Sequence, residues 1–462
     1  MNYISTRGKS PAQGFGDTML TGLAPDGGLY VPDSWPRLEF SQIAEITALP
    51  YEEAAVEIMR HFIGDSFSEE SFRECVTAAY SGFDHKARCP IVQTDSNEFL
   101  LELFHGPTLA FKDVAMQLIG HLFDASLTER DERKTIIGAT SGDTGSAAIE
   151  AFRGRKTVDV FIMYPHGRIS EVQRRQMTTP DDDNVHALAV EGDFDDCQRL
   201  LKELFGDSGF RDRVRIGAVN SINWARVMAQ VVYYFTAAVA VGAPERAVSF
   251  TVPTGNFGDV YAGYVARRLG LPVDRLIVAT NQNDILHRTF ETGIHEKHGV
   301  TPSMSPSMDI QVSSNFERVL FDSCGRDGDR VRGLMASLQQ EGAFEVPEDA
   351  LPMLRREFAS GRASERETAA TMRQIFEETG HLICPHTSVG MKVARDNRGE
   401  SPMVVLATAH AAKFPEAAEE ACGVRPALPD SMADIFTRPE RTIRVSNDAE
   451  AVKSIIEERT AA

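Results

Sequence analysis

The chain has no excess of positive charge. Its 462 residues include 48 Lys and Arg against 67 Asp and Glu, which gives a net charge of −19 at pH 7. Proteins that bind nucleic-acid phosphates carry basic stripes, and no run of Lys and Arg stands out in this sequence. The charge therefore argues against a nucleic-acid-binding protein.

Cysteine is sparse, and its spacing encodes neither a disulfide framework nor a zinc ribbon. No Cys-x-x-Cys pair occurs, which excludes a zinc ribbon and a disulfide-stapled scaffold. The six cysteines lie far apart along the chain, at Cys75, Cys89, Cys197, Cys324, Cys384 and Cys422. They are typical of unpaired thiols in a reducing compartment. No tight cluster of His and carboxylate side chains indicates a metal, so we expect none.

Long apolar segments are also missing. The first residues, MNYISTRGKSPAQGFGD, contain no apolar core of the kind found in a signal peptide. Residues 227–244 run for 18 positions without a charge, slightly short of the ~20 that a transmembrane helix needs. They include Gln230, Gly242 and Pro244. We expect a buried helix here, in a cytoplasmic protein without membrane contacts.

What the chain does have is an average globular composition, with 42% hydrophobic and 25% charged residues. Continuous apolar runs alternate with helical patterns at 134–140, 158–165, 184–192, 247–253, 274–281 and 402–410. Such runs are typical of parallel strands buried on both faces and joined by helices. The pattern predicts the α/β class with open, doubly wound sheets.

The first 95 residues differ from the rest. Helical patterns dominate at 50–65 and 68–83, after a turn-rich start. We therefore predict an N-terminal domain over 1–95, a first α/β domain over 96–245, a second over 246–425, and a C-terminal tail over 426–462. Residues 295–345, rich in Ser, Met, Gly and Asp, predict an irregular insert with helices.

Three segments lie where an α/β fold places ligands, at the carboxyl end of a strand and the start of a helix. The first is ATSGDTGSAA at 139–148. Ser141, Asp143 and Thr144 surround a turn whose backbone N–H groups open a helix, and such an end attracts anions. An ordinary capped helix start explains the same residues equally well.

The second segment is PTGNFGD at 253–259. Gly255 and Gly258 allow the backbone to approach a phosphate closely, and Asn256 adds a donor. A simple Gly-rich turn is the alternative, although it needs fewer donors than this segment supplies.

The third segment, LELFHGPTLAFKDVAMQ at 101–117, places Lys112 in an apolar setting. Burial disfavours the charged form of lysine and exposes a neutral amine that can act as nucleophile and base. A lysine that extends from a partly buried segment into water is the alternative.

A reactive lysine and a phosphate cradle together suit pyridoxal 5′-phosphate, an aldehyde that carries a phosphate. The order of the segments resembles fold-type II pyridoxal-phosphate enzymes, with Thr408 in the last position. More narrowly, the chain resembles the threonine synthase family in its longer form. The matching segments are YISTRG (3–8), GLAPDGGLYVP (22–32), FHGPTLAFKD (104–113), SGDTGSAA (141–148), NSINWAR (220–226), PTGNFGD (253–259) and TAHAAKF (408–414). Ala411 stands where that family usually has Pro.

This resemblance implies two doubly wound domains of the tryptophan-synthase-β-like kind and an additional, mostly helical N-terminal domain. It also implies a carbon–oxygen lyase that converts O-phospho-L-homoserine and water to L-threonine and phosphate. Lys112 would hold the cofactor as a Schiff base and then move protons. Thr408 would hydrogen-bond the cofactor's ring nitrogen, and the phosphate pocket with its support would come from Gly255, Asn256, Phe257 and Asp259.

The remaining roles implied by the resemblance concern the substrate. Ser141, Asp143 and Thr144 would face the substrate carboxylate or the cofactor's ring oxygen, although a carboxylate at Asp143 is unfavourable there unless protonated or turned away. Lys413 and Arg226 are the candidates for the leaving phosphate. Structural ion pairing is an equally weighted alternative for both residues.

Two other functions stay open at this stage. The same architecture supports elimination without water addition, which gives a keto acid and ammonia. A non-catalytic binding module of the same fold is the other alternative, against which Lys112 argues, because pure binding needs no Schiff base. The sequence allows a monomer or a homodimer.

Overall fold

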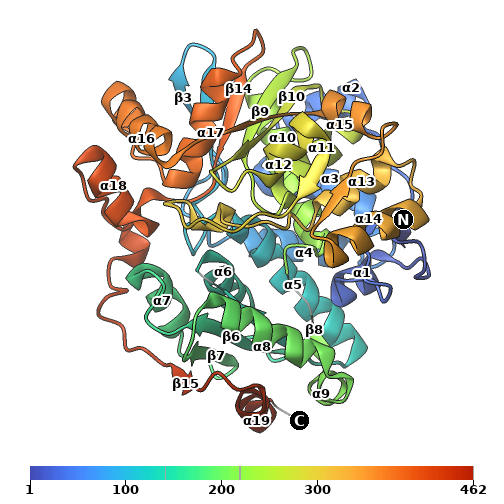
Figure 1. Cartoon of the computed structure of the whole chain (residues 1–462), viewed down its shortest axis with the longest axis vertical. Helices are drawn as coiled ribbons and strands as arrows, with labels where there is room; N and C mark the ends of the chain where they lie inside the picture. Colours follow the sequence, from blue (N-terminus) through green and yellow to red (C-terminus); the bar gives the residue numbers. More distant parts are fainter. Residues whose placement is uncertain (141, 218–219, 461–462) are drawn as a thin grey trace.

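The computed structural model describes residues 1–140, 142–217 and 220–460 of the chain. Two open sheets lie in separate halves of the molecule, the larger in the upper half of Figure 1 and the smaller in the lower half. This arrangement confirms the predicted α/β class with two doubly wound sheets.

The large sheet has six strands in the order β13-β10-β9-β14-β4-β3. Its strands are β3 (Ile91–Asp95), β4 (Glu98–Glu102), β9 (Val248–Pro253), β10 (Val273–Thr280), β13 (Phe358–Arg362) and β14 (Met403–Ala407). All pairings are parallel except the antiparallel pair β3–β4. Every residue of β9 and β14 is buried, which explains their continuous apolar sequences.

Helices cover both faces of the large sheet. Val404 and Leu406 join one core while Val405 and Ala407 join another, because successive side chains of a strand point to opposite faces. Helices α11 (Gly258–Arg268), α12 (Ile285–Thr292) and α17 (Pro385–Asp396) pack on these strands. Helix α10 (Trp224–Ala240) packs against α11, and α16 (Glu365–Thr379) packs against α17. The carboxyl ends of β9, β10 and β14 therefore open at one shared edge.

The small sheet has five parallel strands in the order β15-β7-β6-β5-β8. They are β5 (Lys134–Ala139), β6 (Val158–Pro165), β7 (Val185–Val190), β8 (Ile216–Gly217) and β15 (Ile443–Val445). The helices around it are α5 (Lys112–Arg130), α6 (Asp143–Phe152), α7 (Glu171–Thr178), α8 (Phe194–Gly206), α9 (Ser208–Val214) and α19 (Ala449–Arg459).

The N-terminal part is mostly helical, as predicted. It contains β1 (Tyr3–Ser5), α1 (Phe15–Thr21), β2 (Tyr30–Pro32), α2 (Phe40–Ile46), α3 (Tyr51–Ile63) and α4 (Glu69–Tyr80). These helices pack against α5 and α10. The uncharged run at 227–244 falls mainly in α10, which is buried along almost its whole length. Within the described ranges, no helix is both long and apolar enough to span a bilayer.

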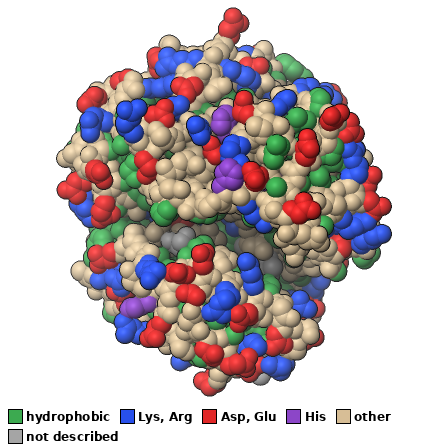
Figure 2. Space-filling view, in the orientation of Figure 1, with side chains coloured by type: hydrophobic (Ala, Val, Ile, Leu, Met, Phe, Trp, Pro, Cys, Tyr) green, Lys and Arg blue, Asp and Glu red, His purple; other side chains and the backbone are tan. Residues whose placement is uncertain are grey.

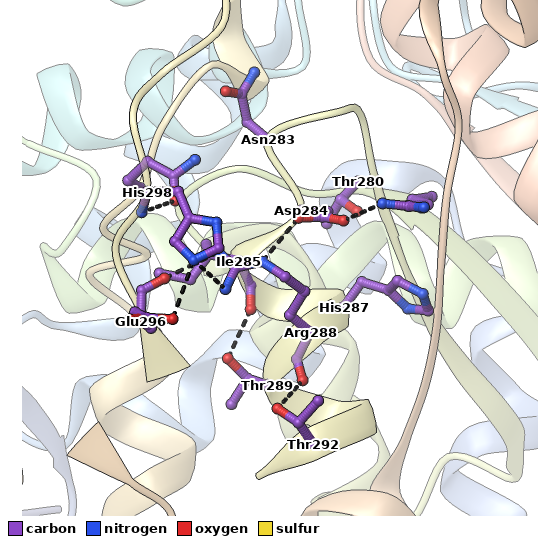
Figure 3. A network of polar contacts seen from close by, with 12 residues as sticks. Thr280, Asn283, Asp284, Ile285, His287, Arg288, Thr289, Thr292, Glu296 and His298 are labelled. Carbon is purple, nitrogen blue, oxygen red and sulfur yellow. Dashed lines mark hydrogen bonds and ion pairs between the residues drawn. The ribbon is translucent and has the colours of Figure 1, made fainter. Parts of the chain in front are cut away.

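The predicted irregular insert follows β10. The elements after β10 that belong to neither the large sheet nor the small sheet, nor to the helices already named, are β11 (Ile294–Glu296), η1 (Pro306–Met308), α13 (Phe316–Ser323), α14 (Gly328–Gln340), β12 (Ala343–Glu345), α15 (Leu351–Glu357), η2 (Ala411–Lys413), α18 (Pro415–Cys422) and η3 (Asp430–Met432). Polar contacts join the insert to α12 (Figure 3). Asp284 accepts hydrogen bonds from Arg288 and Arg362, and Arg288 also donates to the Glu296 carbonyl.

Two elements cross the domain limits expected from the sequence. Strand β4, at the start of the expected first α/β domain, pairs with β14 in the large sheet. The tail contributes β15 and α19 to the small-sheet half. Both placements follow from partners distant in sequence, which supply the hydrogen bonds and apolar cover that these segments need. The domain limits themselves stay a prediction.

Candidate active site

Lys112 begins helix α5 and is 9% exposed. Its Nζ lies 3.5 Å from Asp143 Oδ2. Burial lowers the pKa of Lys112. The nearby cations Lys413 and Arg226 lower it further, whereas Asp143 opposes the shift. The neutral amine is therefore more accessible here than on an ordinary lysine.

Asp143 is the first residue of α6, directly beyond the end of β5. Its Oδ1 lies 2.8 Å from Lys413 Nζ and accepts a hydrogen bond from Gln173 Nε2 at 2.9 Å. Burial alone would raise the pKa of Asp143, but Lys413 and Lys112 hold it well below its ordinary value. The carboxylate is thus ionised and neutralised, which answers the sequence-based objection to a carboxylate at this position.

Lys413 is fully buried and its ammonium is engaged by protein groups. Besides Asp143, it donates to the Thr108 carbonyl at 2.7 Å. The geometry favours the ion-pairing alternative for Lys413. Thr144, the next residue of α6, is half-buried, and Ser141 lies outside the described residues.

The glycine segment after β9 forms an anion cradle. Among the described residues, the backbone N–H groups of Gly255, Asn256, Phe257 and Gly258 have no hydrogen-bond partner. Phe257 has φ +63°, in the left-handed region, and the next residue begins α11. A run of free N–H groups with such a turn, at a helix start, binds anions.

Gly255 has no room for a side chain. A Cβ there would lie 2.7 Å from the Ser307 carbonyl oxygen. The side chain of Asn256 is exposed.

Asp259 is turned away from the cradle toward α10. Its Oδ1 accepts hydrogen bonds from the hydroxyls of Tyr233 and Tyr234. Burial raises the pKa of Asp259 to about 7 although both tyrosines oppose the shift. The contacts make Asp259 an anchor for the first turn of α11.

Arg226 is a buried cation without an acceptor among the described residues. It lies on α10 with 4% exposure, and no described residue accepts a hydrogen bond from its guanidinium. Burial lowers its pKa to about 10, so it stays charged at neutral pH. Because an unpaired buried charge is costly, the arrangement indicates that an anion binds beside it.

Thr408 follows β14 and joins the Lys112 segment. Its carbonyl accepts from the Phe111 N–H at 2.8 Å, while its hydroxyl has no partner among the described residues. A hydroxyl with no partner among the described residues, on a residue hydrogen-bonded to the segment before Lys112, fits the role that the resemblance implies.

Two neighbours of this site were not predicted from the sequence. Gln173 on α7 binds Asp143, and the polar helix pattern around it gave the only available signal. His386 in α17 accepts from the Ser307 N–H at 3.2 Å. Burial lowers the pKa of His386 to about 4. Asp143 opposes this shift, whereas Lys112 and Lys413 add to it. No local pattern distinguished this histidine.

The site draws on both halves of the molecule. Asp143 and Gln173 come from the small-sheet half, whereas the glycine cradle and Thr408 come from the large-sheet half. Figure 2 shows a hollow across the face of the molecule between its upper and lower parts. Ligands of doubly wound folds bind at this kind of edge.

These groups fit pyridoxal 5′-phosphate, because they offer an amine for its aldehyde and free donors for its phosphate. Residues 90–409 match the family model described as pyridoxal-phosphate dependent enzyme. Fold and site therefore define a fold-type II pyridoxal-phosphate-dependent enzyme. Models for the threonine synthase N terminus and C-terminal region match residues 2–80 and 387–456.

The chain belongs to the threonine synthase family. It is 52% identical over 459 residues to a threonine synthase of Pseudomonas aeruginosa, covering 99% of this chain and 98% of that protein. A pyridoxal-phosphate-bound threonine synthase structure from Brucella melitensis matches with 54% identity, a TM-score of 0.98 and complete coverage of both chains. The yeast enzyme matches with 38% identity and a TM-score of 0.94, over 99% of this chain and 98% of that one.

Proposed function

We propose that this protein converts O-phospho-L-homoserine and water to L-threonine and phosphate with bound pyridoxal 5′-phosphate. In this reaction the Cγ–O bond breaks and water adds to Cβ. The observation that carries this proposal is a buried Lys112 amine together with the anion cradle at residues 255–258, in a chain that matches threonine synthases over its full length. The cofactor, when bound, supplies an electron sink for carbanion chemistry.

The roles of the chain's own groups follow from their environment. Lys112 Nζ accepts the substrate's α-proton and returns protons to the substrate carbons, since its lowered pKa makes a neutral amine available. The N–H groups of residues 255–258 hold the cofactor phosphate. The Thr408 hydroxyl binds the cofactor's ring nitrogen. Arg226 balances the charge of the substrate phosphate.

The segment 141–144 has a different task. Thr144 and Ser141 bind the substrate carboxylate, and Asp143 is kept ionised by Lys413. Lys413 acts as a positioning residue in this proposal. The cost of placing Asp143 close to a substrate carboxylate is reduced because the Lys413 ammonium lies 2.8 Å from it.

The decisive experiment follows the oxygen of water. Purified protein with pyridoxal 5′-phosphate and O-phosphohomoserine in ¹⁸O-water should give threonine labelled at its hydroxyl, with one phosphate released per threonine. A keto acid and ammonia would instead support simple elimination. Cofactor binding without any product would support the binding module.

Lys112→Ala is the matching control. Without this amine the protein should lose both turnover and the visible absorption of a lysine-bound cofactor, because nucleophile and base are removed together. Near-normal activity in this variant would refute the catalytic assignment.

We further propose a cytoplasmic monomer or homodimer that binds no nucleic acid. All six cysteines are free, as in a reducing compartment, and the net charge of −19 opposes binding to phosphate backbones. Light scattering after size exclusion would determine the oligomeric state.

A further inference from the structure

Arg318 on α13 is a buried arginine without a carboxylate partner among the described residues. Its side chain is fully buried over the rings of Trp224 and Tyr261. The guanidinium donates to the carbonyls of Tyr30 at 3.0 Å and Ile222 at 2.6 Å, and to Asn315 Oδ1. Burying a charge to bind neutral oxygens is costly, so the contacts themselves need an explanation.

The contact with Asn315 leads to the anion cradle. Since Arg318 occupies the amide oxygen of Asn315, the amide nitrogen must point the other way. That Nδ2 donates to the carbonyls of Asn256 at 3.1 Å and Ser221 at 3.0 Å. The backbone N–H of Asn315 also donates to the Asn256 carbonyl at 3.1 Å, and the Ser313 hydroxyl donates to the Gly255 carbonyl.

These bonds set the direction of the free N–H groups. In a trans peptide the C=O and the following N–H point to opposite sides of the chain. When Ser313 and Asn315 hold the carbonyls of Gly255 and Asn256 on one side, the N–H groups of Asn256 and Phe257 point to the other. Both of these N–H groups belong to the anion cradle at residues 255–258.

We propose that Arg318 is a positioning residue. Through Asn315 it orients the free N–H groups of the cradle toward the cofactor phosphate, and through the Tyr30 carbonyl it links this orientation to the N-terminal domain. The inference rests on the proposed binding of that phosphate at residues 255–258. It makes the N-terminal domain a determinant of cofactor affinity, although its β2 strand lies outside the cradle.

The test compares two arginines that bind the same N-terminal strand. Arg326 donates to the carbonyls of Pro32 and Asp33, but it contacts neither Asn315 nor the cradle. Arg318→Met and Arg326→Met therefore both remove a bond to this strand, and only the first also releases Asn315.

Pyridoxal 5′-phosphate and pyridoxal, which lacks the phosphate, are titrated separately onto each apo-protein and followed by visible absorption. In Arg318→Met the preference for the phosphorylated form should fall about tenfold, the effect of losing about 1.4 kcal/mol. Arg326→Met should keep the wild-type preference. A general structural defect would weaken both ligands equally and leave their ratio unchanged.

Asn315→Ala supplies a second variant if Arg318→Met does not fold. It should lower the same ratio, and the double variant should lose no more than either single one, because both residues act on one set of bonds. An unchanged ratio in Arg318→Met and Asn315→Ala would overturn the inference. A wild-type protein that does not prefer the phosphorylated form would instead refute the phosphate site of the proposed function.

Discussion

Lys413 and Asp143 neutralise each other inside the site, and their burial makes the pair sensitive to the loss of one partner. Lys413→Met should lower the free energy of unfolding of the apo-protein by about 3–5 kcal/mol, because it leaves a buried carboxylate poorly compensated. Adding Asp143→Leu to this variant should recover part of the loss. Urea unfolding measures the free energy of unfolding of the wild-type protein, Lys413→Met and the double variant.

An exposed ion pair is the control for this comparison. Arg425 lies 2.9 Å from Glu419, with both side chains about half exposed, and Arg425→Met should change the free energy of unfolding little. Equal losses of unfolding free energy in Lys413→Met and Arg425→Met would show that the buried pair contributes no more to stability than the exposed one.

Asp259 should make stability fall as pH rises. Its ordinary pKa of 3.8 is raised to about 7 by burial, so the folded state holds this proton over a range in which the unfolded chain releases it. The contribution is complete below about pH 4 and lost as pH approaches 7. Asp259→Asn keeps an acceptor for both tyrosines and should flatten the decline.

Unfolding midpoints in urea, measured at several pH values for both proteins, test this expectation. Part of the slope should remain in the variant, because burial also raises the pKa of Asp113 to about 6. Identical slopes in the two proteins would show that Asp259 does not carry the effect.

Helix α19 packs against α8 and α9 in the small-sheet half although it comes last in the chain. Ile456 is fully buried in a cluster with Leu188, Leu200 and Phe210. Ile456→Ala should cost about 2–5 kcal/mol of unfolding free energy, since it leaves a cavity in this cluster. Glu458→Ala, on the exposed side of the same helix, should have little effect. Chemical denaturation compares the unfolding free energies of the two variants. Equal values would show that Ile456 adds no core packing to the stability of the fold.

Elements with strong local patterns were predictable, and β6 covers the same residues, 158–165, as its apolar run. Strand β15 was missed because it has three residues and is defined by its pairing with β7. The same distinction applies to the site. Lys112 and Gly255 stand in recognisable motifs, whereas Arg318 acquires its role from Tyr30, 288 positions away. No local pattern encodes such a contact.

Because both halves contribute to the site, cofactor binding should stabilise the folded molecule. Pyridoxal 5′-phosphate at a hundred times its Kd should add about 2.7 kcal/mol to the free energy of unfolding, provided that the unfolded chain does not bind it. The unfolding midpoint in urea should therefore rise with cofactor concentration. A midpoint independent of the cofactor would mean that the ligand does not bind the native state preferentially.

The strand order of the large sheet has a consequence for synthesis on the ribosome. Strand β14 lies between β9 and β4, and it is translated about 300 residues after β4. At about 5–20 residues per second, this interval lasts about 15–60 s. Until β14 emerges, the sheet exists only as two pieces with open edges, which can pair with other nascent chains. The large sheet therefore cannot be completed until its central strand has been translated.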